Sequence, residues 1–521
     1  MNAKKEKIII TLALVFIIAL GGFLRFYQLD KIPNGFFCDE ATDGYIAYSI
    51  LHTGRDLTGN FLPLFIDHHG FDKVEPLYTY LTILPVKLFG LTVFSTRFMP
   101  ALFGTLLILS TFLLTREVFK NKKIALIAST IVALSPWSFI FSRIGFRGIF
   151  SPFIITLGLY FFLRALKKPH NLLYAALIFG ISAYTYSNMK VVLPLIILTL
   201  MLFYRKELKQ FFISNSRITI ISSLVFIVLL YPIIYQNVFG QVNVYNIHLS
   251  IFYLADSPPL QFFINYVKHL SPSFLFLNGD PNIRHGVFGY GQILIILFPF
   301  IVLSLFTKHK KNFWLLLMLF LIGIFPAALA QIAVPHALRS IAATPFLEII
   351  AAYGIYKFLH LTNKNRVLKF TCTALITGAV LVNSCFFFYD YFVTYPVYST
   401  PAWQYGMSEA IFYAEQHKQA YDIIMLNNVT NFSIDSSYYY FPSYPFALFF
   451  GKIDPKAWAG QYQPIGKYQI CGGYMYDCII PDKKVLYIIA NGDTSRFHIL
   501  KTILNPDGTI ALTIAKNKQE E

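Results

Sequence analysis

The sequence predicts a polytopic α-helical membrane protein with a small C-terminal α/β domain. The chain of 521 residues is 56% hydrophobic and only 13% charged, whereas soluble domains carry about 25% charged residues. Apolar runs that suit a bilayer core of about 30 Å recur along its first three quarters. From residue 389 onward, short apolar stretches alternate with turn residues instead, which is typical of strands.

About eleven apolar segments are candidate membrane spans. The first follows MNAKKEK and resembles a signal peptide, but no small-x-small cleavage site comes after it, which indicates an uncleaved signal anchor. The fifth and sixth segments fit either one hairpin or two closely linked helices. The segments are 8–24, 98–115, 124–141, 150–163, 172–188, 191–204, 218–235, 291–307, 313–330, 341–358 and 370–388.

The formal charge of +17 indicates membrane topology and not a nucleic-acid partner. Lys and Arg concentrate in five connections between apolar segments: TREVFKNKK, RALKKPHN, RKELKQFFISNSR, KHKKN and LTNKNRVLK. Short basic loops stay on the cytoplasmic side. We therefore expect a multi-pass protein of the plasma (inner) membrane, in contact with membrane lipids, with a cytoplasmic N-terminus and an extracytoplasmic C-terminal domain.

This topology divides the chain into a membrane domain, 1–388, and an outer domain, 389–521. Within the membrane domain, two long loops, 25–97 and 236–290, face outward. The first loop contains GYIAYSILHTG and PLYTYLTILPVKLFG, whose apolar faces predict helices in the interface plane. The outer domain has a helical pattern in PAWQYGMSEAIFYAEQHKQA and strand patterns in YDIIMLNN, KVLYIIANGD and GTIALTIAK. We interpret it as a cap or acceptor platform.

The outer loop after the first apolar segment contains the adjacent acids Asp39 and Glu40, in FFCDEATDGYIAYSILHTGRD. Such a pair is either a solvated surface feature or a catalytic one. A carboxylate at the interface acts as a general base on a hydroxyl if it is aimed at the proton. Arginine binds phosphate bidentately and keeps its charge, although it also serves at lipid headgroups and helix ends. The predicted outer face holds these candidate donor-phosphate groups: Lys73, Arg143, Arg147, Arg284, His285, His336 and Arg339.

One acid and several cations suit the transfer of a sugar from a lipid phosphate. The acid takes the proton of an acceptor hydroxyl, and the cations stabilise the departing phosphate. A phosphate leaving group needs little protonation, unlike the leaving group of glycoside hydrolysis. Glu75 and Tyr45 are candidate substrate contacts, the tyrosine by stacking on sugar. The alternative is a transporter or lipid flippase, which should show broken helices in matching repeats; the sequence has no clear repeat.

Three motifs resemble a known family. DEATDGYIAYSILHTGRD, SPWSFIFSRIGFR and PHALRSIAATPFLEIIAAYG are similar to bacterial members of the dolichyl-phosphate-mannose–protein mannosyltransferase group, glycosyltransferase family 39, and its aminoarabinose-transferase relatives. The resemblance covers roughly residues 8–388. It implies a GT-C-type fold, a polyprenyl-phosphate-linked sugar donor, inversion at the anomeric carbon and Asp39 at the catalytic position. It also implies that Glu40 supports Asp39 and that Arg143 and Arg147 contact the donor phosphate.

Several points stay open. Aminoarabinose-transferase relatives often have an arginine after the acidic pair and a later Lys-Pro, where this chain has Thr42 or Asp43 and Glu75-Pro76. The sugar is open, and the acceptor is a protein, a lipid or a glycan. No cofactor is indicated with certainty: a divalent metal at the phosphate is left open, and adjacent His68 and His69 rarely bind one ion. Cys471 and Cys478 form a disulfide if their segment is extracytoplasmic, and are free thiols otherwise.

Overall fold

The computed structural model divides the chain into two compact units. The first contains residues 1–27 and 100–389, and the second contains residues 28–99 and 390–521. The predicted division assigned the first outer loop to the membrane domain, but the structure groups residues 28–99 with the C-terminal region. The structure describes residues 3–68, 72–239, 248–306, 310–362, 365–427, 429–434, 437–457, 465–472, 474–490 and 493–518.

The first unit is helical, and each predicted span contains a helix. Within the described residues, seven helices are long and apolar enough to cross a membrane. The region 172–204 contains two separate helices, α8 and α9, joined by a short connection. The helices are α1 (Ala3–Phe26), α4 (Val93–Phe119, which begins in the second unit), α5 (Lys122–Leu134), α6 (Pro136–Phe141), α7 (Phe150–Ala165), α8 (Asn171–Ser182), α9 (Met189–Phe203), α10 (Arg205–Ser214), α11 (Ser216–Phe239), α13 (Ile251–Leu254), α14 (Pro258–Leu270), α15 (Phe298–Leu305), α16 (Lys310–Ala328), α17 (Phe346–Leu361) and α18 (Arg366–Tyr389).

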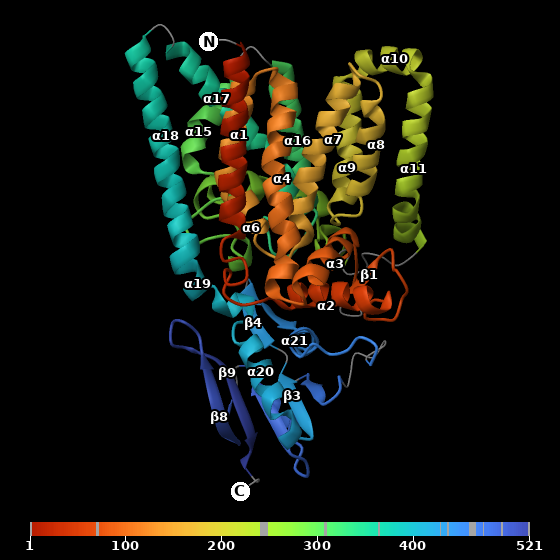
Figure 1. Ribbon diagram of the computed structural model, residues 1–521, viewed down its shortest axis with the longest axis vertical. Helices are drawn as coiled ribbons and strands as arrows, with labels where there is room; N and C mark the ends of the chain where they lie inside the picture. Colours follow the sequence, from red (N-terminus) through yellow and green to blue (C-terminus); the bar gives the residue numbers. More distant parts are fainter. Residues whose placement is uncertain are drawn as a thin grey trace. The chain divides into compact units, whose positions relative to one another are not determined.

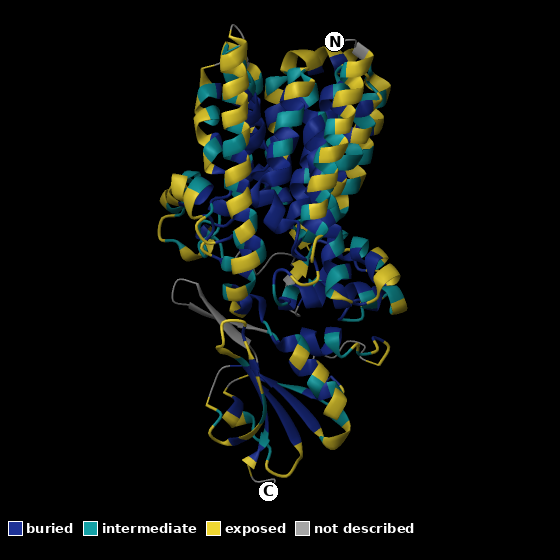
Figure 2. Ribbon diagram, turned by 60° about the vertical axis from the view of Figure 1, so that its left-hand side comes forward, coloured by how far each residue is buried: buried dark blue, intermediate teal, exposed yellow. Residues whose placement is uncertain are grey.

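The helices of this unit bury their inner faces and expose apolar outer faces (Figure 2). Val228 and Phe239 of α11, and Val367 and Phe370 of α18, are each more than 60% exposed. Contiguous exposed apolar surface is uncommon on soluble proteins, but it is what a lipid-facing helix presents. The N-terminal end of α1 and the helix α10 lie at the same end of the bundle (Figure 1), which agrees with the side assigned to the basic connections.

A buried arginine holds α1 against α5 and α6. The Arg25 guanidinium is fully buried and donates to the carbonyl oxygens of Val132 and Ala133 at the end of α5. It also donates to the hydroxyls of Ser138 and Ser142. A buried charge requires such a complete set of acceptors, so these contacts define how α1 packs against α5 and α6.

The second unit combines the first outer loop with the C-terminal region. Its five-stranded sheet has the order β6-β3-β7-β9-β8, in which β6, β3 and β7 are parallel and β9 and β8 antiparallel. The predicted helix and three predicted strands are present as α20, β3, β7 and β9. The elements are α2 (Cys38–Thr53), β1 (Ile66–His68), β2 (Asp72–Val74), α3 (Leu77–Phe89), α19 (Tyr395–Tyr398), α20 (Met407–His417), β3 (Ile423–Asn427), β4 (Val429–Ile434), β5 (Ser437–Phe441), α21 (Tyr444–Phe450), β6 (Tyr468–Cys471), β7 (Val485–Ile489), β8 (Phe497–Leu504) and β9 (Ile510–Asn517).

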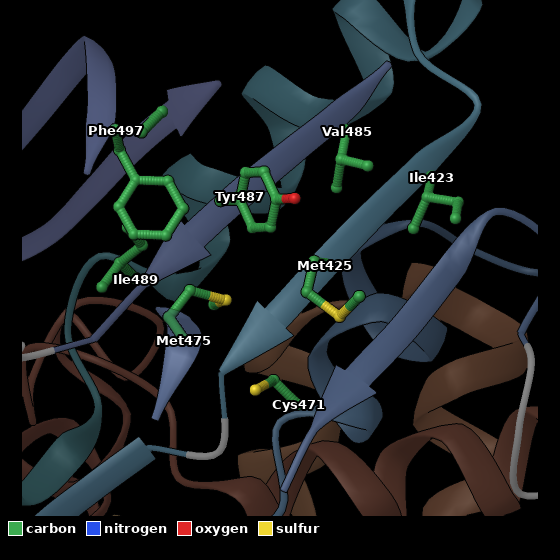
Figure 3. Close-up of a cluster of buried hydrophobic side chains, with 9 residues drawn as sticks. Ile423, Met425, Cys471, Met475, Val485, Tyr487, Ile489 and Phe497 are labelled. Carbon is green, nitrogen blue, oxygen red and sulfur yellow. The ribbon is translucent and has the colours of Figure 1, made fainter. Parts of the chain in front are cut away.

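The sheet has its own apolar core, drawn in Figure 3. Strand β3 contributes Ile423 and Met425, and strand β7 contributes Val485, Tyr487 and Ile489, all at most 5% exposed. Continuous burial along both strands is typical of central parallel strands, which are covered on both faces. At the edge of this core, residues 471 and 478 form the disulfide that the sequence left open.

Candidate active site

The candidate base, Asp39, lies in the first turn of α2. Glu40 accepts a hydrogen bond from the Phe37 backbone N–H at 3.1 Å, which satisfies one donor at the helix start. Gly54 ends the helix in the left-handed conformation, with φ of 71°. Most of α2 is buried, and it packs against α3 and α21. It is therefore a core helix of the second unit, and its position in the interface plane stays a prediction.

Glu40 is held by a partner that the sequence analysis missed. Arg97 Nε lies 2.8 Å from Glu40 Oε1, and Arg97 Nη2 lies 2.9 Å from Oε2. The remaining N–H groups of Arg97 donate to the carbonyl oxygens of Leu29, Pro33 and Gly35. Both charged side chains are fully buried. With both oxygens engaged, Glu40 is suited to positioning the start of α2 and not to accepting a substrate proton.

Asp39 differs from its neighbour in exposure: it is half-buried, whereas Glu40 is completely enclosed. Its Oδ1 lies 3.6 Å from the Cys38 thiol. The Cys38 backbone N–H donates to Gln404 Oε1 at 2.8 Å, and the Phe36 N–H donates to the carbonyl of Trp403 at 2.8 Å. The C-terminal region thus fixes the backbone that carries Asp39. This finding adds a positioning role to a region that the sequence analysis interpreted as a cap.

A second carboxylate lies one helical turn after Asp39. Asp43 is buried, accepts a hydrogen bond from the Thr79 hydroxyl at 3.0 Å, and lies 3.7 Å from His68 Nε2. Residues four apart share one helix face, so the spacing of Asp39 and Asp43 could have identified this second acid. His69, the other histidine of the weak metal candidate, lies outside the described residues.

The other candidates of the second unit have different environments. Tyr45 is completely buried, and its hydroxyl donates to the Ile453 carbonyl at 2.8 Å; burial raises the pKa of that hydroxyl. No ring face of Tyr45 is accessible, so its burial gives no support to the prediction that it stacks on a sugar. Glu75 is buried, at 2% exposure. Lys73 is exposed on β2, in register with Asp67 of β1.

The predicted arginines of the first unit divide into two groups. Arg143 is completely buried, and its Nη1 donates to the carbonyls of Leu24 and Arg25 at 2.8 and 3.0 Å. It satisfies the C-terminal carbonyls of α1, the helix-end alternative that the sequence left open. Arg147 and Arg339 are only half-buried. Arg339 Nη1 donates to the Ile332 carbonyl at 2.8 Å, which orients the side chain.

The remaining predicted residues form a buried cluster around Asp280. Its Oδ2 accepts hydrogen bonds from His285 Nδ1 at 2.9 Å and from the Ala337 N–H at 2.7 Å. Burial lowers the pKa of His285 against the opposing effect of Asp280, and burial and the Arg339 charge lower that of His336 well below its usual value. The buried Arg284 contributes a further positive charge, which lowers both pKa values.

Three side chains of this cluster have the spacing of a metal site. Asp280, His285 and His336 offer ligand atoms within 4.8 Å of one another, and two imidazoles with a carboxylate form a plausible zinc set. The Asp280 carboxylate, however, already accepts three hydrogen bonds, the third from the Asn282 N–H. Cationic Arg284 and Arg339 lie close enough to affect both histidines. The donor set fits a hydrogen-bonded structural cluster better than a cation site.

Comparison with known proteins identifies the fold. The chain superimposes on the crystal structure of ArnT from Cupriavidus metallidurans in the apo state with a TM-score of 0.58 and 12% identity, over 97% of this chain and 98% of that one. It has the GT-C fold. The same ArnT bound to undecaprenyl phosphate gives a TM-score of 0.57 at 11% identity, with the same coverage.

Two further comparisons bear on the resemblance. The apo oligosaccharyltransferase of Archaeoglobus fulgidus shares the GT-C fold at a TM-score of 0.50 and 15% identity, over 98% of this chain and 75% of that one. Residues 72–238 match the model of the dolichyl-phosphate-mannose-protein mannosyltransferase family. The predicted resemblance is confirmed by the family match together with the fold. A comparison with curated protein sequences gave no match.

Proposed function

We propose that the protein is an integral membrane glycosyltransferase that transfers a sugar from a polyprenyl-phosphate-linked donor to an acceptor hydroxyl on the extracytoplasmic face. The observation that carries this proposal is the contrast between Asp39 and Glu40 in a GT-C fold: one acid is half-exposed, and the other is neutralised and locked. The complex of a structurally similar ArnT with undecaprenyl phosphate supports a lipid-phosphate donor.

Asp39 is the proposed general base. Glu40 is fully buried with both oxygens engaged by Arg97, whereas Asp39 is half-buried, so Asp39 is the member of the pair that an acceptor hydroxyl can reach. The first turn of a helix favours negative charge because the helix dipole is positive there. Asp39 takes the acceptor hydroxyl proton as the oxygen attacks the anomeric carbon.

The donor phosphate leaves as the new bond forms. The bond between the anomeric carbon and the phosphate oxygen breaks, and the phosphate keeps the electron pair. A single displacement of this kind inverts the anomeric configuration. Cations stabilise the developing charge. The half-buried Arg147 and Arg339 are better suited to this role than Arg143, whose guanidinium is enclosed at the end of α1.

The test is sugar transfer by the full chain reconstituted in proteoliposomes with labelled polyprenyl-phosphate sugars. Wild type should consume the donor, and Asp39→Asn should lower the rate about 10²–10⁴-fold, the usual contribution of a general base. Asp482→Asn, an exposed acid of the second unit, is the matched control and should retain the wild-type rate. NMR analysis of the product should find the inverted anomer.

Two results would overturn the proposal in different ways. Transfer by Asp39→Asn at the wild-type rate would exclude the base assignment. A wild-type protein that leaves every lipid-linked donor intact but moves a solute or lipid across the bilayer would favour the transporter alternative.

A further inference from the structure

The second unit contains a cavity of about 560 Å³ in a part of the molecule to which the proposed reaction assigns no role. Its walls come from Asp30, the segment 89–94, Phe412 of α20 and the end of α21, all of which belong to this unit. Within that segment, α4 begins at Val93 and is long and apolar enough to cross a membrane. The basic connection TREVFKNKK follows α4, which predicts that the start of this helix faces outward. The cavity is therefore expected at the depth of the outer phospholipid head groups.

The wall of the cavity is largely aromatic. Half of the residues that line it are phenylalanines: Phe89, Phe94, Phe412, Phe449 and Phe450. The ring centroids of Phe89 and Phe94 lie 5.3 Å apart, and those of Phe412 and Phe450 lie 5.7 Å apart. Phenylalanine has no polar group, so this wall offers apolar surface but no hydrogen bonds to the hydroxyls of a sugar. It suits a hydrocarbon chain.

Two charged residues of opposite sign, Asp30 and Lys452, also line the cavity. Both are exposed. Neither forms an ion pair with any other residue that the structure describes. One free carboxylate and one free ammonium group beside an apolar wall favour a ligand that carries both charges and a hydrocarbon part.

The backbone of Lys452 has an unusual conformation. Helix α21 ends at Phe450, and Lys452 follows with φ of 47°, in the left-handed region where glycine is favoured. The Ile453 N–H donates to the Leu448 carbonyl at 3.2 Å, which fixes this turn. Side chains held in such strained conformations often belong to ligand sites. A lysine here also complements the negative end of the helix, so the test must measure binding and not only stability.

From these observations we infer that the cavity binds phosphatidylethanolamine, a phospholipid whose head group carries a phosphate and a primary ammonium group. Lys452 binds the phosphate, Asp30 accepts hydrogen bonds from the ammonium group, and the phenylalanine rings cover the start of the acyl chains. A diacyl lipid of this kind has no free hydroxyl, so it is not an acceptor in the proposed reaction. The inference therefore goes beyond the proposed function and does not rest on it.

Native mass spectrometry of the full-length, delipidated protein in detergent tests the inference. The protein is titrated with phosphatidylethanolamine or with phosphatidylglycerol of the same acyl chains. Wild type should bind phosphatidylethanolamine about tenfold more tightly, the equivalent of about 1.4 kcal/mol for one charge-assisted contact. Asp30→Asn should remove this preference, because only the ammonium group uses the carboxylate. Lys452→Gln should weaken the binding of both lipids about tenfold, and Lys452→Arg should bind within about threefold of wild type, since it keeps the charge.

Further variants separate the cavity from general electrostatics. Phe412 is 49% exposed, so Phe412→Ser should be tolerated and should weaken both lipids equally by removing apolar wall. Lys87→Gln is the matched control for Lys452, because Lys87 is an exposed cation of α3 that lies outside the cavity. Asp482→Asn is the control for Asp30. Both controls should bind the two lipids as wild type does.

Three results would overturn the inference. Equal affinity of wild type for the two lipids would exclude recognition of the ammonium group. Unchanged affinity for phosphatidylethanolamine in folded Asp30→Asn or folded Lys452→Gln would exclude this cavity as the site. Equal competition by soluble glycerophosphoethanolamine would exclude a role for the acyl chains and favour a soluble ligand. Sugar transfer does not enter these measurements, so the proposed function is tested separately.

Discussion

Removing Glu40 should loosen the start of α2, because it leaves Arg97 as an uncompensated buried charge. Both side chains are fully buried, and the pair is joined at 2.8 and 2.9 Å. Breaking one partner of a buried ion pair costs about 3–5 kcal/mol, whereas replacing both by apolar groups is often neutral. We therefore expect Glu40→Ala to lose about this amount of local stability and Glu40→Ala/Arg97→Met to recover most of it.

Cys38 provides a reporter for this opening. Its thiol is completely buried at the start of α2, two residues before Glu40. The other free cysteines, Cys372 and Cys385, are more exposed and should be replaced by serine. When opening is fast and reversible, labelling by a maleimide reports the free energy of opening. A loss of 3–5 kcal/mol should then accelerate labelling by roughly 10²–10³-fold or more.

The matched control is an exposed ion pair in the same unit. Glu409 lies 2.8 Å from Lys501, and both side chains are at least 40% exposed. Surface pairs contribute about 0–1 kcal/mol, so Glu409→Ala should leave Cys38 labelling within about fivefold of the background. If Glu40→Ala labels no faster than Glu409→Ala, or if the double variant labels as fast as the single one, the argument from a buried charge is refuted.

Three further outcomes are expected. Gln404→Ala should lower kcat more than the affinity for lipid donor, because it releases the Cys38 N–H that it binds at 2.8 Å; an equal loss in donor binding would contradict a positioning role. Reduction of the Cys471–Cys478 disulfide should destabilise the sheet by about 2–3 kcal/mol, given the short loop it closes, and chemical unfolding with and without reductant measures this. The free energy of unfolding should have its full value above pH about 6.5 and decrease as the pH falls toward 4. Burial lowers the pKa of His269 to about 4, against the opposing effect of Asp280 and with the added effect of Arg339 and Lys268; a flat stability profile in scanning calorimetry over that range would contradict this.

Much of the fold could be predicted because the length of an apolar segment and the positions of charged residues are local properties of the chain. Each predicted span contains a helix, and the stretches around Met425, Tyr487 and Ile514 form strands of one sheet as expected. The strand pattern is readable because side chains buried on both faces must be apolar at successive positions. The division into units was less predictable, since it depends on contacts between residues far apart in sequence, such as Phe36 with Trp403.

The candidate site could be predicted only in part. The sequence singled out Asp39 and Glu40 but could not say which acid was engaged, because their difference depends on Arg97, 57 positions from Glu40. It treated Arg143 and Arg147 alike, although Arg143 caps α1 and Arg147 remains half-buried. An isolated arginine at the edge of an apolar helix, like Arg97, was an available signal, since such a charge needs a partner.

The sequence by itself determined the class of protein, the helices and the residue types available for chemistry. A segment that lies in lipid must be apolar and long enough to span it, and charged residues stay in water, so both are visible along the chain. Tertiary structure alone decided which charges are enclosed and which remain available. Enclosure depends on the arrangement of distant segments: Glu40 is neutralised by Arg97, whereas Arg147 and Arg339 are only half-buried. Burial without a partner is costly for a charge, so the partners that folding brings together decide what each residue can do.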